Sequence, residues 1–244
     1  MKKVLYITNT LASYRVSFFK KFNAICELTI LFTDFQMGYD VYSENSRINE
    51  IEEINYVTIR TKDLLNLSKN GIDLQKYDYV ILPAPDGKKG LLTSYLALIA
   101  SKRSQKKTAL FWIRWNADKC SVPWKQQFKN MLRNIAVRPI AHGVDSCICA
   151  GKKSYENFLK LGVNKDKIHM THYANDIDVG SEDINVYDEY PVPPNKKYIL
   201  YIGRIIERKG LLDLIIAFSN IKNSDYVLLI GGDGQDYLVI VNVD

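Results

Sequence analysis

The sequence predicts an α/β fold with a mainly parallel sheet, and two observations support that prediction. Apolar segments of strand length alternate along the chain with longer segments of helical periodicity, which is the order expected of repeated βαβ units. Each apolar segment is nearly continuous, as in strands that are buried on both faces. The strands predicted in the first part of the chain are 4–8, 28–32, 56–59, 79–82, 109–113, 146–150 and 168–171.

Helices are predicted between most of these strands. The first helix follows strand 4–8, because Val16, Phe19 and Phe22 recur at helical spacing. The helix over 152–161 is expected to end at Gly162, since glycine readily adopts the left-handed conformation that closes a helix. The other predicted helices are 90–100 and 123–137. Together these elements define a first domain over residues 1–174.

The rest of the chain divides into a linker and a second unit. Segment 175–196 is acidic, contains three prolines and has no clear period, so it is predicted to be a linker. Residues 197–244 then give a strand at 198–202, a helix beginning near Lys209 and a strand at 226–230. Such a unit is too small to bury a full core alone. We expect this unit to pack against the first domain, to pair with another chain, or to be a fragment.

Composition and charge restrict the class of protein. The chain has 244 residues and a net charge of +6, with 47% apolar residues, as in an ordinary soluble globular protein. No apolar run approaches the length needed to span a bilayer, and no signal peptide is evident. Between residues 88 and 167, 17 basic residues stand against 4 acidic ones. This block predicts an anionic partner, namely lipid headgroups, nucleic acid or a phosphorylated substrate, or else a merely solvated basic surface.

The strand at 198–202 leads into a candidate phosphate site. Gly203 and Arg204 follow its carboxyl end, where open α/β sheets bind ligands, and Lys209 stands at the start of the next helix. An arginine grips phosphate oxygens in a bidentate manner, and a lysine adds a mobile positive charge. The alternative is that Arg204 and Lys209 form surface ion pairs with Glu207 or Asp213.

A glycine-rich turn, Gly231-Gly232-Asp233-Gly234, follows the strand at 226–230. Glycines there permit a close approach of the backbone to a ligand. A plain tight turn explains the same pattern. The sequence is not the dinucleotide fingerprint G-x-G-x-x-G, which would also follow the first strand of its unit.

Taken together, these motifs resemble a known family. The pattern G-R-x4-K-G after a strand, then an apolar helix and a strand ending in G-G-D-G, resembles the nucleotide-sugar domain of the retaining GT-B glycosyltransferases of family 4. The first domain resembles members that build bacterial capsule, O-antigen or exopolysaccharide. The residues that match there are K-K-V-L-Y-I-T-N-T at 2–10, Tyr14-Arg15-x2-Phe18-Phe19, Ala150-Gly151 with Ser154 and Tyr155, Leu161-Gly162-Val163, and Lys167-Ile168.

The resemblance implies a GT-B-like fold, with an N-terminal Rossmann-like domain and an incomplete second one. It implies that Arg204 and Lys209 are catalytic, holding the donor's diphosphate and stabilising it as it leaves, without a metal or other cofactor. The donor-binding residues would be Gly203, Arg204, Lys209, Gly232 and Gly234. The acceptor side would be formed by Asn9, Arg15, Arg114 and Asn116.

The chain departs from the family pattern in three places. The family's E-x7-E motif, which contacts the donor, would lie beyond residue 244. The glycine-rich first loop is replaced by Thr8-Asn9-Thr10-Leu11-Ala12. The histidine after the fifth strand is replaced within F-W-I-R-W-N at 111–116, so Arg114 or Asn116 would take its place.

Metal ligands are not predicted. Asp176-Ile177-Asp178 has the D-x-D form that binds divalent metals, but it lies in the acidic linker, where a solvated surface is expected. The three histidines lack ligand spacing, and the four cysteines are interpreted as buried, reduced thiols.

The predicted helix over 123–138 has an unusual pattern. Trp124, Phe128, Met131 and Ile135 form one stripe, and Lys125, Lys129 and Arg133 form an adjacent row. An apolar stripe bordered by cations suits a helix that lies on an anionic membrane. The alternative is that the stripe packs on the protein's own sheet.

We therefore expect a cytoplasmic glycosyltransferase, peripheral on the inner face of the membrane. It would transfer a sugar from a nucleotide-diphosphate donor to a lipid-linked or saccharide acceptor in cell-surface polysaccharide synthesis. Nucleic acid is not expected as a partner. The alternatives are a catalytically inactive truncated fragment of such an enzyme, or a basic α/β protein that binds nucleic acid. A nicotinamide-dependent enzyme would need a glycine-rich turn after the first strand, which is absent.

Overall fold

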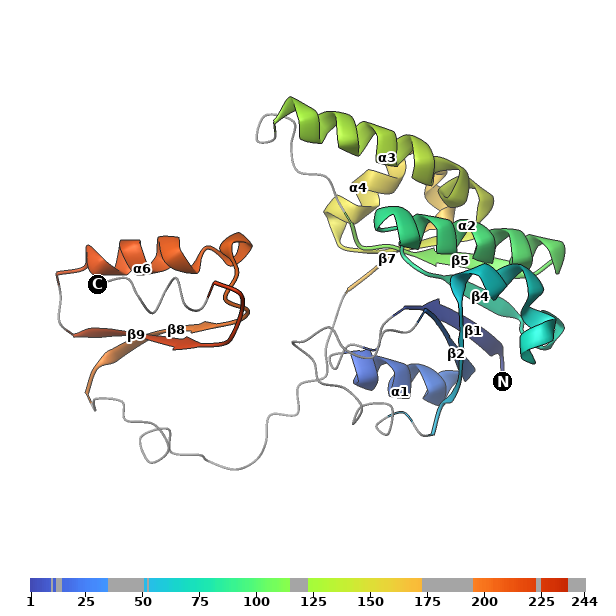
Figure 1. The fold of residues 1–244 in the computed structure, drawn as a ribbon, viewed down its shortest axis with the longest axis horizontal. Helices are drawn as coiled ribbons and strands as arrows, with labels where there is room; N and C mark the ends of the chain where they lie inside the picture. Colours follow the sequence, from blue (N-terminus) through green and yellow to red (C-terminus); the bar gives the residue numbers. More distant parts are fainter. Residues whose placement is uncertain are drawn as a thin grey trace. The chain divides into compact units, whose positions relative to one another are not determined.

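The computed structural model describes residues 1–9, 11, 15–34, 51, 53–114, 123–172, 195–222 and 225–236. The chain divides into two compact units, Met1–Ile177 and Asp178–Asp244, which are called unit 1 and unit 2 below (Figure 1). Most of the predicted linker 175–196 lies outside the described residues.

Unit 1 is built on a seven-stranded sheet in the order β3-β2-β1-β4-β5-β6-β7. Every neighbouring pair in it is parallel, which confirms the predicted α/β class. Each of the seven predicted strands is present. Their bounds are β1 Lys3–Thr8, β2 Glu27–Thr33, β3 Asn55–Ile59, β4 Tyr79–Leu82, β5 Lys107–Phe111, β6 Ser146–Ala150 and β7 Ile168–Thr171.

Helices cover both faces of this sheet, so the central strands are buried on both sides (Figure 1). In β1, Val4 and Tyr6 join the core beneath α1, while Leu5 and Ile7 join the core beneath the other helices. This arrangement explains the continuous apolar runs, because alternate side chains of a strand point to opposite faces. Among the residues that the structure describes, the α-helices of unit 1 are α1 Val16–Ile25, α2 Gly87–Arg103, α3 Trp124–Gly143 and α4 Lys152–Lys160.

The 3₁₀ segments were not predicted, and one of them contributes to the core. The 3₁₀ segment Thr61–Asn70 buries Leu64 and Leu67 and packs against α2. Its backbone is kinked at Asn66, which has non-helical dihedral angles. Two further short 3₁₀ turns are Leu74–Lys76 and Lys165–Lys167.

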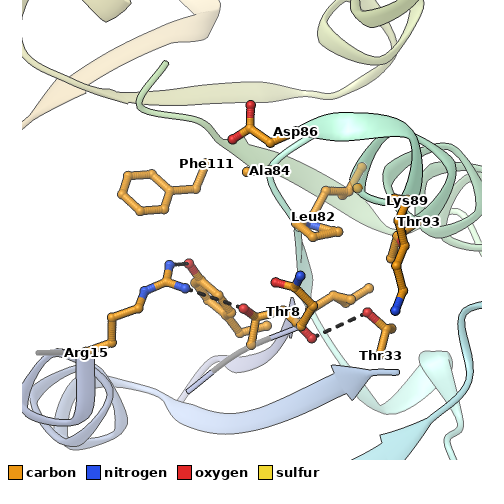
Figure 2. Close-up of a pocket in the computed structure, with 14 residues that line it drawn as sticks. Thr8, Arg15, Thr33, Leu82, Ala84, Asp86, Lys89, Thr93 and Phe111 are labelled. Carbon is orange, nitrogen blue, oxygen red and sulfur yellow. Dashed lines mark hydrogen bonds between the residues drawn. The ribbon is translucent and has the colours of Figure 1, made fainter. Parts of the chain in front are cut away.

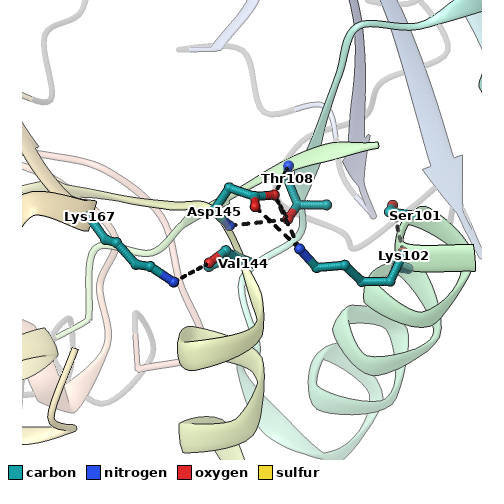
Figure 3. Close-up of polar contacts among 7 residues, drawn as sticks. Ser101, Lys102, Thr108, Val144, Asp145 and Lys167 are labelled. Carbon is teal, nitrogen blue, oxygen red and sulfur yellow. Dashed lines mark hydrogen bonds and ion pairs between the residues drawn. The ribbon is translucent and has the colours of Figure 1, made fainter. Parts of the chain in front are cut away.

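Asp145 ties together several elements at the amino end of the sheet (Figure 3). Its carboxylate accepts hydrogen bonds from the backbone N–H and the hydroxyl of Thr108, both at 2.8 Å, and from Lys102 Nζ at 3.3 Å. Lys167 Nζ donates to the carbonyl of the neighbouring Val144 at 3.3 Å. Burial opposes ionisation of Asp145, but the Thr108 hydrogen bonds and the Lys102 charge outweigh it and lower its pKa. The resulting stabilisation is present above the unfolded-state pKa and is lost as the pH falls through the folded-state pKa.

Two smaller predictions are also tested in unit 1. Gly162 follows α4 with φ of +80°, and Val163 N–H donates back to Phe158 O at 3.1 Å, which confirms the predicted helix end. Cys26, Cys147 and Cys149 are buried free thiols, as predicted, and burial raises the pKa of Cys147 to about 12. Cys120 lies outside the described residues.

Unit 2 contains the predicted strand, helix and strand. β8 (Lys197–Ile202) and β9 (Tyr226–Gly231) form a parallel pair. The helix α6 (Leu211–Ser219) starts two residues later than predicted, because Gly210 has φ of +65° and follows a 3₁₀ turn at Glu207–Lys209. Leu200 and Ile202 are exposed. The described residues of unit 2 therefore do not close a core of their own, as its size suggested.

Within the described ranges of both units, no helix is long and apolar enough to cross a membrane.

Candidate functional site

A pocket opens at the carboxyl ends of β1, β2, β4 and β5 in unit 1 (Figure 2). The chain runs outward from β1 through β2 to β3 and then returns to β4 on the other side of β1. Ligands of open α/β sheets bind at such a switch point. The pocket has a volume of about 160 Å³. Its polar lining includes Thr8, Asn9, Arg15, Asp86, Lys89 and Thr93.

Arg15, predicted on the acceptor side, lines this pocket just before α1. It donates to the Tyr6 hydroxyl at 2.9 Å and to Thr8 Oγ1 at 3.4 Å. Its guanidinium carbon lies 5.8 Å from the centre of the Tyr6 ring and 5.7 Å from that of Phe19. Burial raises the pKa of Tyr6 against the opposing effect of Arg15, so the tyrosine stays neutral. Within the described ranges, no carboxylate pairs with Arg15 to compensate its charge.

Lys89 enters the pocket from α2, on the other side from Arg15 (Figure 2). Its ammonium lies 3.5 Å from Asp34 Oδ2. Asp34 also accepts hydrogen bonds from the Thr61 hydroxyl at 2.6 Å and from the Thr61 N–H at 3.1 Å. Burial would raise the pKa of Asp34, but the Thr61 hydrogen bonds and the Lys89 charge lower it. Asp34 is therefore ionised, and its carboxylate holds Lys89 only loosely. The Lys89 side chain is half-exposed.

Among the described residues that line the pocket, Asp86 is the one with an acidic side chain. Its Oδ1 accepts hydrogen bonds from Trp112 Nε1 at 3.3 Å and from Arg114 Nη1 at 3.2 Å. The structure thus places Arg114, another predicted acceptor-side residue, against Asp86, outside the pocket lining. Asn9 lines the pocket, as its position after β1 suggested. Asn116 lies outside the described residues.

Asp86 and Lys89 were missed by the sequence analysis. A usable signal existed, because both follow the carboxyl end of the strand at 79–82, the edge of the sheet where ligands bind.

The predicted phosphate corner lies in unit 2. Arg204 and Lys209 are both exposed after β8. Neither forms an ion pair with any residue that the structure describes, Glu207 and Asp213 included, so the surface-pair alternative is not realised. The loop is nonetheless ordered by its backbone. Gly203 N–H donates to Gly231 O at 3.0 Å, and Ile205 N–H donates to Asp233 O at 2.8 Å.

Gly232 and Gly234 allow this pairing to continue beyond the strands. A β-carbon at Gly232 would overlap the carbonyl oxygen of Gly203, and one at Gly234 would overlap that of Ile205. Both glycines therefore permit a close approach of two loop backbones. Their predicted contact with a donor, like that of Gly203, stays a prediction.

In the described part of the chain, no group of three or more His, Cys, Asp or Glu side chains is placed to hold a metal ion. The D-x-D segment at 176–178 lies outside the described residues.

No protein-family model matches the chain, and no curated protein matches its sequence. Solved structures do match its fold. HepE of Anabaena, solved with UDP, has a TM-score of 0.69 at 12% identity, covering 99% of this chain and 64% of HepE. Sucrose-phosphate synthase from Thermosynechococcus elongatus gives 0.59 at 12% identity, with 94% and 62% covered. UDP-N-acetylglucosamine 2-epimerase from Rickettsia bellii gives 0.55 at 14% identity, with 100% and 65% covered.

At these identities the comparisons establish the fold alone. The chain has the α/β, Rossmann-like architecture of GT-B proteins, as the sequence predicted. It spans less than two thirds of the length of each of these structures.

Proposed function

We propose that this protein is a glycosyltransferase that takes a sugar from a nucleotide-diphosphate donor. The observation that supports this best is the pair of exposed cations, Arg204 and Lys209, at the carboxyl end of β8 in a GT-B fold. The acceptor would be lipid-linked or a saccharide, and the product would belong to cell-surface polysaccharide. By its resemblance to family 4, transfer would proceed with retention of configuration.

The two cations suit this chemistry because negative charge grows on the diphosphate as the sugar leaves it. A guanidinium donates two parallel hydrogen bonds to phosphate oxygens, and the ammonium adds a point charge that follows the leaving group. Interactions that strengthen as charge develops lower the barrier of the transfer step. Arg204 and Lys209 would thus bind the donor and stabilise the departing nucleotide, and this role requires no metal or other cofactor.

UDP binding tests this proposal, with calorimetry as the measurement. Binding is expected to be weak, in the range above micromolar, because the described residues of unit 2 provide two phosphate ligands and little for the base or ribose. Arg204→Gln should weaken binding about tenfold, which corresponds to about 1.4 kcal/mol for one exposed charge-assisted contact. Arg208→Gln is the matched control, since Arg208 is exposed on the adjacent 3₁₀ turn.

Three outcomes would contradict the donor site as described. They are equal losses from Arg204→Gln and Arg208→Gln, no loss from either, or sub-micromolar UDP binding. Turnover of a UDP-sugar by the purified protein would exclude the inactive-fragment alternative. Salt-sensitive binding of DNA or RNA that Arg204→Gln leaves intact would favour the nucleic-acid alternative instead.

We also propose that α3 holds the enzyme on an anionic membrane surface, through the region 123–138. Trp124 is 72% exposed, Phe128 52% and Ile135 61%, and Met131 and Leu132 are half-exposed. The core contacts of α3 come instead from Val137, Ile140 and Ala141 in its later turns. The apolar stripe therefore faces away from the sheet, which contradicts the alternative that it packs against its own domain. Lys125 and Lys129 are exposed beside it, whereas Arg133 is half-buried.

Vesicle binding tests the role of α3. Exchanging Lys125 and Lys129 together for Gln should weaken binding to phosphatidylserine vesicles about 30-fold, at about 1 kcal/mol per cation near the surface. A blue shift of Trp124 emission should accompany binding of the unmodified protein. Lys69→Gln with Lys76→Gln removes the same charge from exposed positions elsewhere on unit 1 and serves as the control. If both double variants bind equally, α3 is not the membrane contact.

A further inference from the structure

We propose that the unit 1 pocket is an anion site that binds a phosphate or diphosphate group, with Arg15 and Lys89 as its cationic ligands. The ligand would be the acceptor, which would then carry a phosphorylated group. The identification as acceptor rests on the proposed glycosyltransferase function, whereas the anion site rests on the pocket alone.

The charges around the pocket support an anionic ligand. Among the described lining residues there are two cations, Arg15 and Lys89, and one carboxylate, Asp86. Asp86 is already paired with Arg114 at the rim, 3.2 Å away. Lys89 has only a 3.5 Å contact with Asp34, which lies outside the lining. Arg15 has no carboxylate partner in the described part of the chain. The described lining therefore carries an excess of positive charge that a bound anion would neutralise.

The geometry of Arg15 supports a phosphate in particular. Its two hydrogen bonds go to neutral hydroxyls, on Tyr6 and Thr8, so they fix the guanidinium without neutralising it. A guanidinium has five N–H donors, and those left over match the oxygens of a phosphate. Cation–π contacts with the Tyr6 and Phe19 rings restrict the side chain further. Arg15 is thus oriented before a ligand arrives.

The position of Lys89 extends the site across the pocket. Arg15 and Lys89 enter from opposite sides, with Thr8 between them (Figure 2). Asn9 is a further polar, uncharged residue of the lining. A diphosphate presents oxygens in two directions, so it could meet both cations at once. The volume of about 160 Å³ equals that of about five water molecules, which suits such a group.

The helix that carries Lys89 also packs against α3. The hydroxyl of Tyr95 in α2 donates a hydrogen bond to the Ala136 carbonyl of α3 at 2.8 Å. A phosphorylated group carried by a membrane lipid would therefore find the pocket on the same unit as the helix that is proposed to rest on the membrane, with α2 joining the two.

The anion site is tested by measuring the binding of inorganic pyrophosphate to a variant that carries both Arg204→Gln and Lys209→Gln. These changes remove the phosphate corner of unit 2, so the remaining binding reports on unit 1. Adding Lys89→Gln should weaken pyrophosphate binding about tenfold. Lys88→Gln, the neighbouring exposed lysine of α2 outside the pocket lining, should leave it unchanged. Arg15→Gln should weaken it at least as much, provided that circular dichroism shows a folded chain.

The outcomes separate this inference from the proposed function. Absence of pyrophosphate binding, or equal losses from Lys89→Gln and Lys88→Gln, would overturn the anion site. UDP binding that is lost with Arg204→Gln but retained with Lys89→Gln would still support the donor site. Geranyl diphosphate distinguishes the source of the anion. Tighter binding of this lipid than of pyrophosphate supports a lipid-linked acceptor, and equal or weaker binding overturns that assignment.

Discussion

Replacing Gly234 with alanine is expected to open unit 2, raising amide hydrogen exchange in β8 and β9 about 100-fold. The new β-carbon would overlap the carbonyl oxygen of Ile205 and lie 2.6 Å from its carbonyl carbon. These are backbone atoms, held by hydrogen bonds to Asp233 and Asp236, so they cannot yield without breaking the pairing. Overpacking of this kind costs about 3 kcal/mol, which corresponds to about two powers of ten in a local opening equilibrium.

Gly231→Ala provides the matched control three residues earlier. A β-carbon there would meet Ile202 Cγ1 at 3.8 Å and Tyr201 O at 3.9 Å, which are ordinary contacts. Exchange in unit 1 serves as an internal reference in both variants. If Gly234→Ala leaves exchange unchanged and only weakens UDP binding, then Gly234 serves a ligand, and the close approach of the two loops is not what requires it.

Trp112→Ala is expected to destabilise unit 1 by about 3–5 kcal/mol, the usual cost of truncating a buried tryptophan. Trp112 is 1% exposed and packs edge-on against Phe158, with ring centres 5.8 Å apart. Its indole N–H also donates to Asp86, so the substitution removes both core volume and a support of the pocket rim. The free energy of unfolding is measured by urea titration. Hydrogen exchange of the amides in β1 and β5 then shows whether the loss falls on unit 1.

Trp124→Ala makes the same chemical change at an exposed position and should alter stability by less than about 0.5 kcal/mol. Trp112→Phe should fall between the two, because it retains most of the packing but loses the donor to Asp86. A cost of Trp112→Ala no larger than that of Trp124→Ala would show that Trp112 is not a core residue.

The strands could be predicted because a parallel sheet covered on both faces requires continuous apolar runs. The predicted bounds of β4, β6 and β7 match the structure to the residue. β5 was predicted at 109–113 but is Lys107–Phe111. The apolar run extends two residues beyond the end of this strand. Trp112 is buried in the core although it follows the strand, and Ile113 is half-exposed. The segment Thr61–Asn70 was missed because the kink at Asn66 breaks its helical period.

The candidate sites were predicted less completely. Asn9 and Arg15 were named from the family resemblance, and both line the pocket of unit 1. The phosphate corner was named from its motif, and its contact with a donor stays a prediction. Asp86 and Lys89 join the pocket lining only because β4 pairs with β1, a neighbour relation that the sequence does not state. The direction of the α3 stripe was also undetermined. One helix carries both a core-facing and an outward apolar set, and periodicity alone does not assign them.

The backbone pairing around Arg204 has a consequence for the entropy of binding. On either side of Arg204, Gly203 is hydrogen-bonded to Gly231 at the end of β9, and Ile205 is hydrogen-bonded to Asp233 in the loop that follows. The Arg204 carbonyl also accepts a hydrogen bond from the Tyr201 hydroxyl at 2.9 Å. The main chain that carries this guanidinium is therefore fixed before any ligand is present. Only side-chain rotamers remain to be ordered on binding, and a preorganised group loses less freedom when it meets its partner.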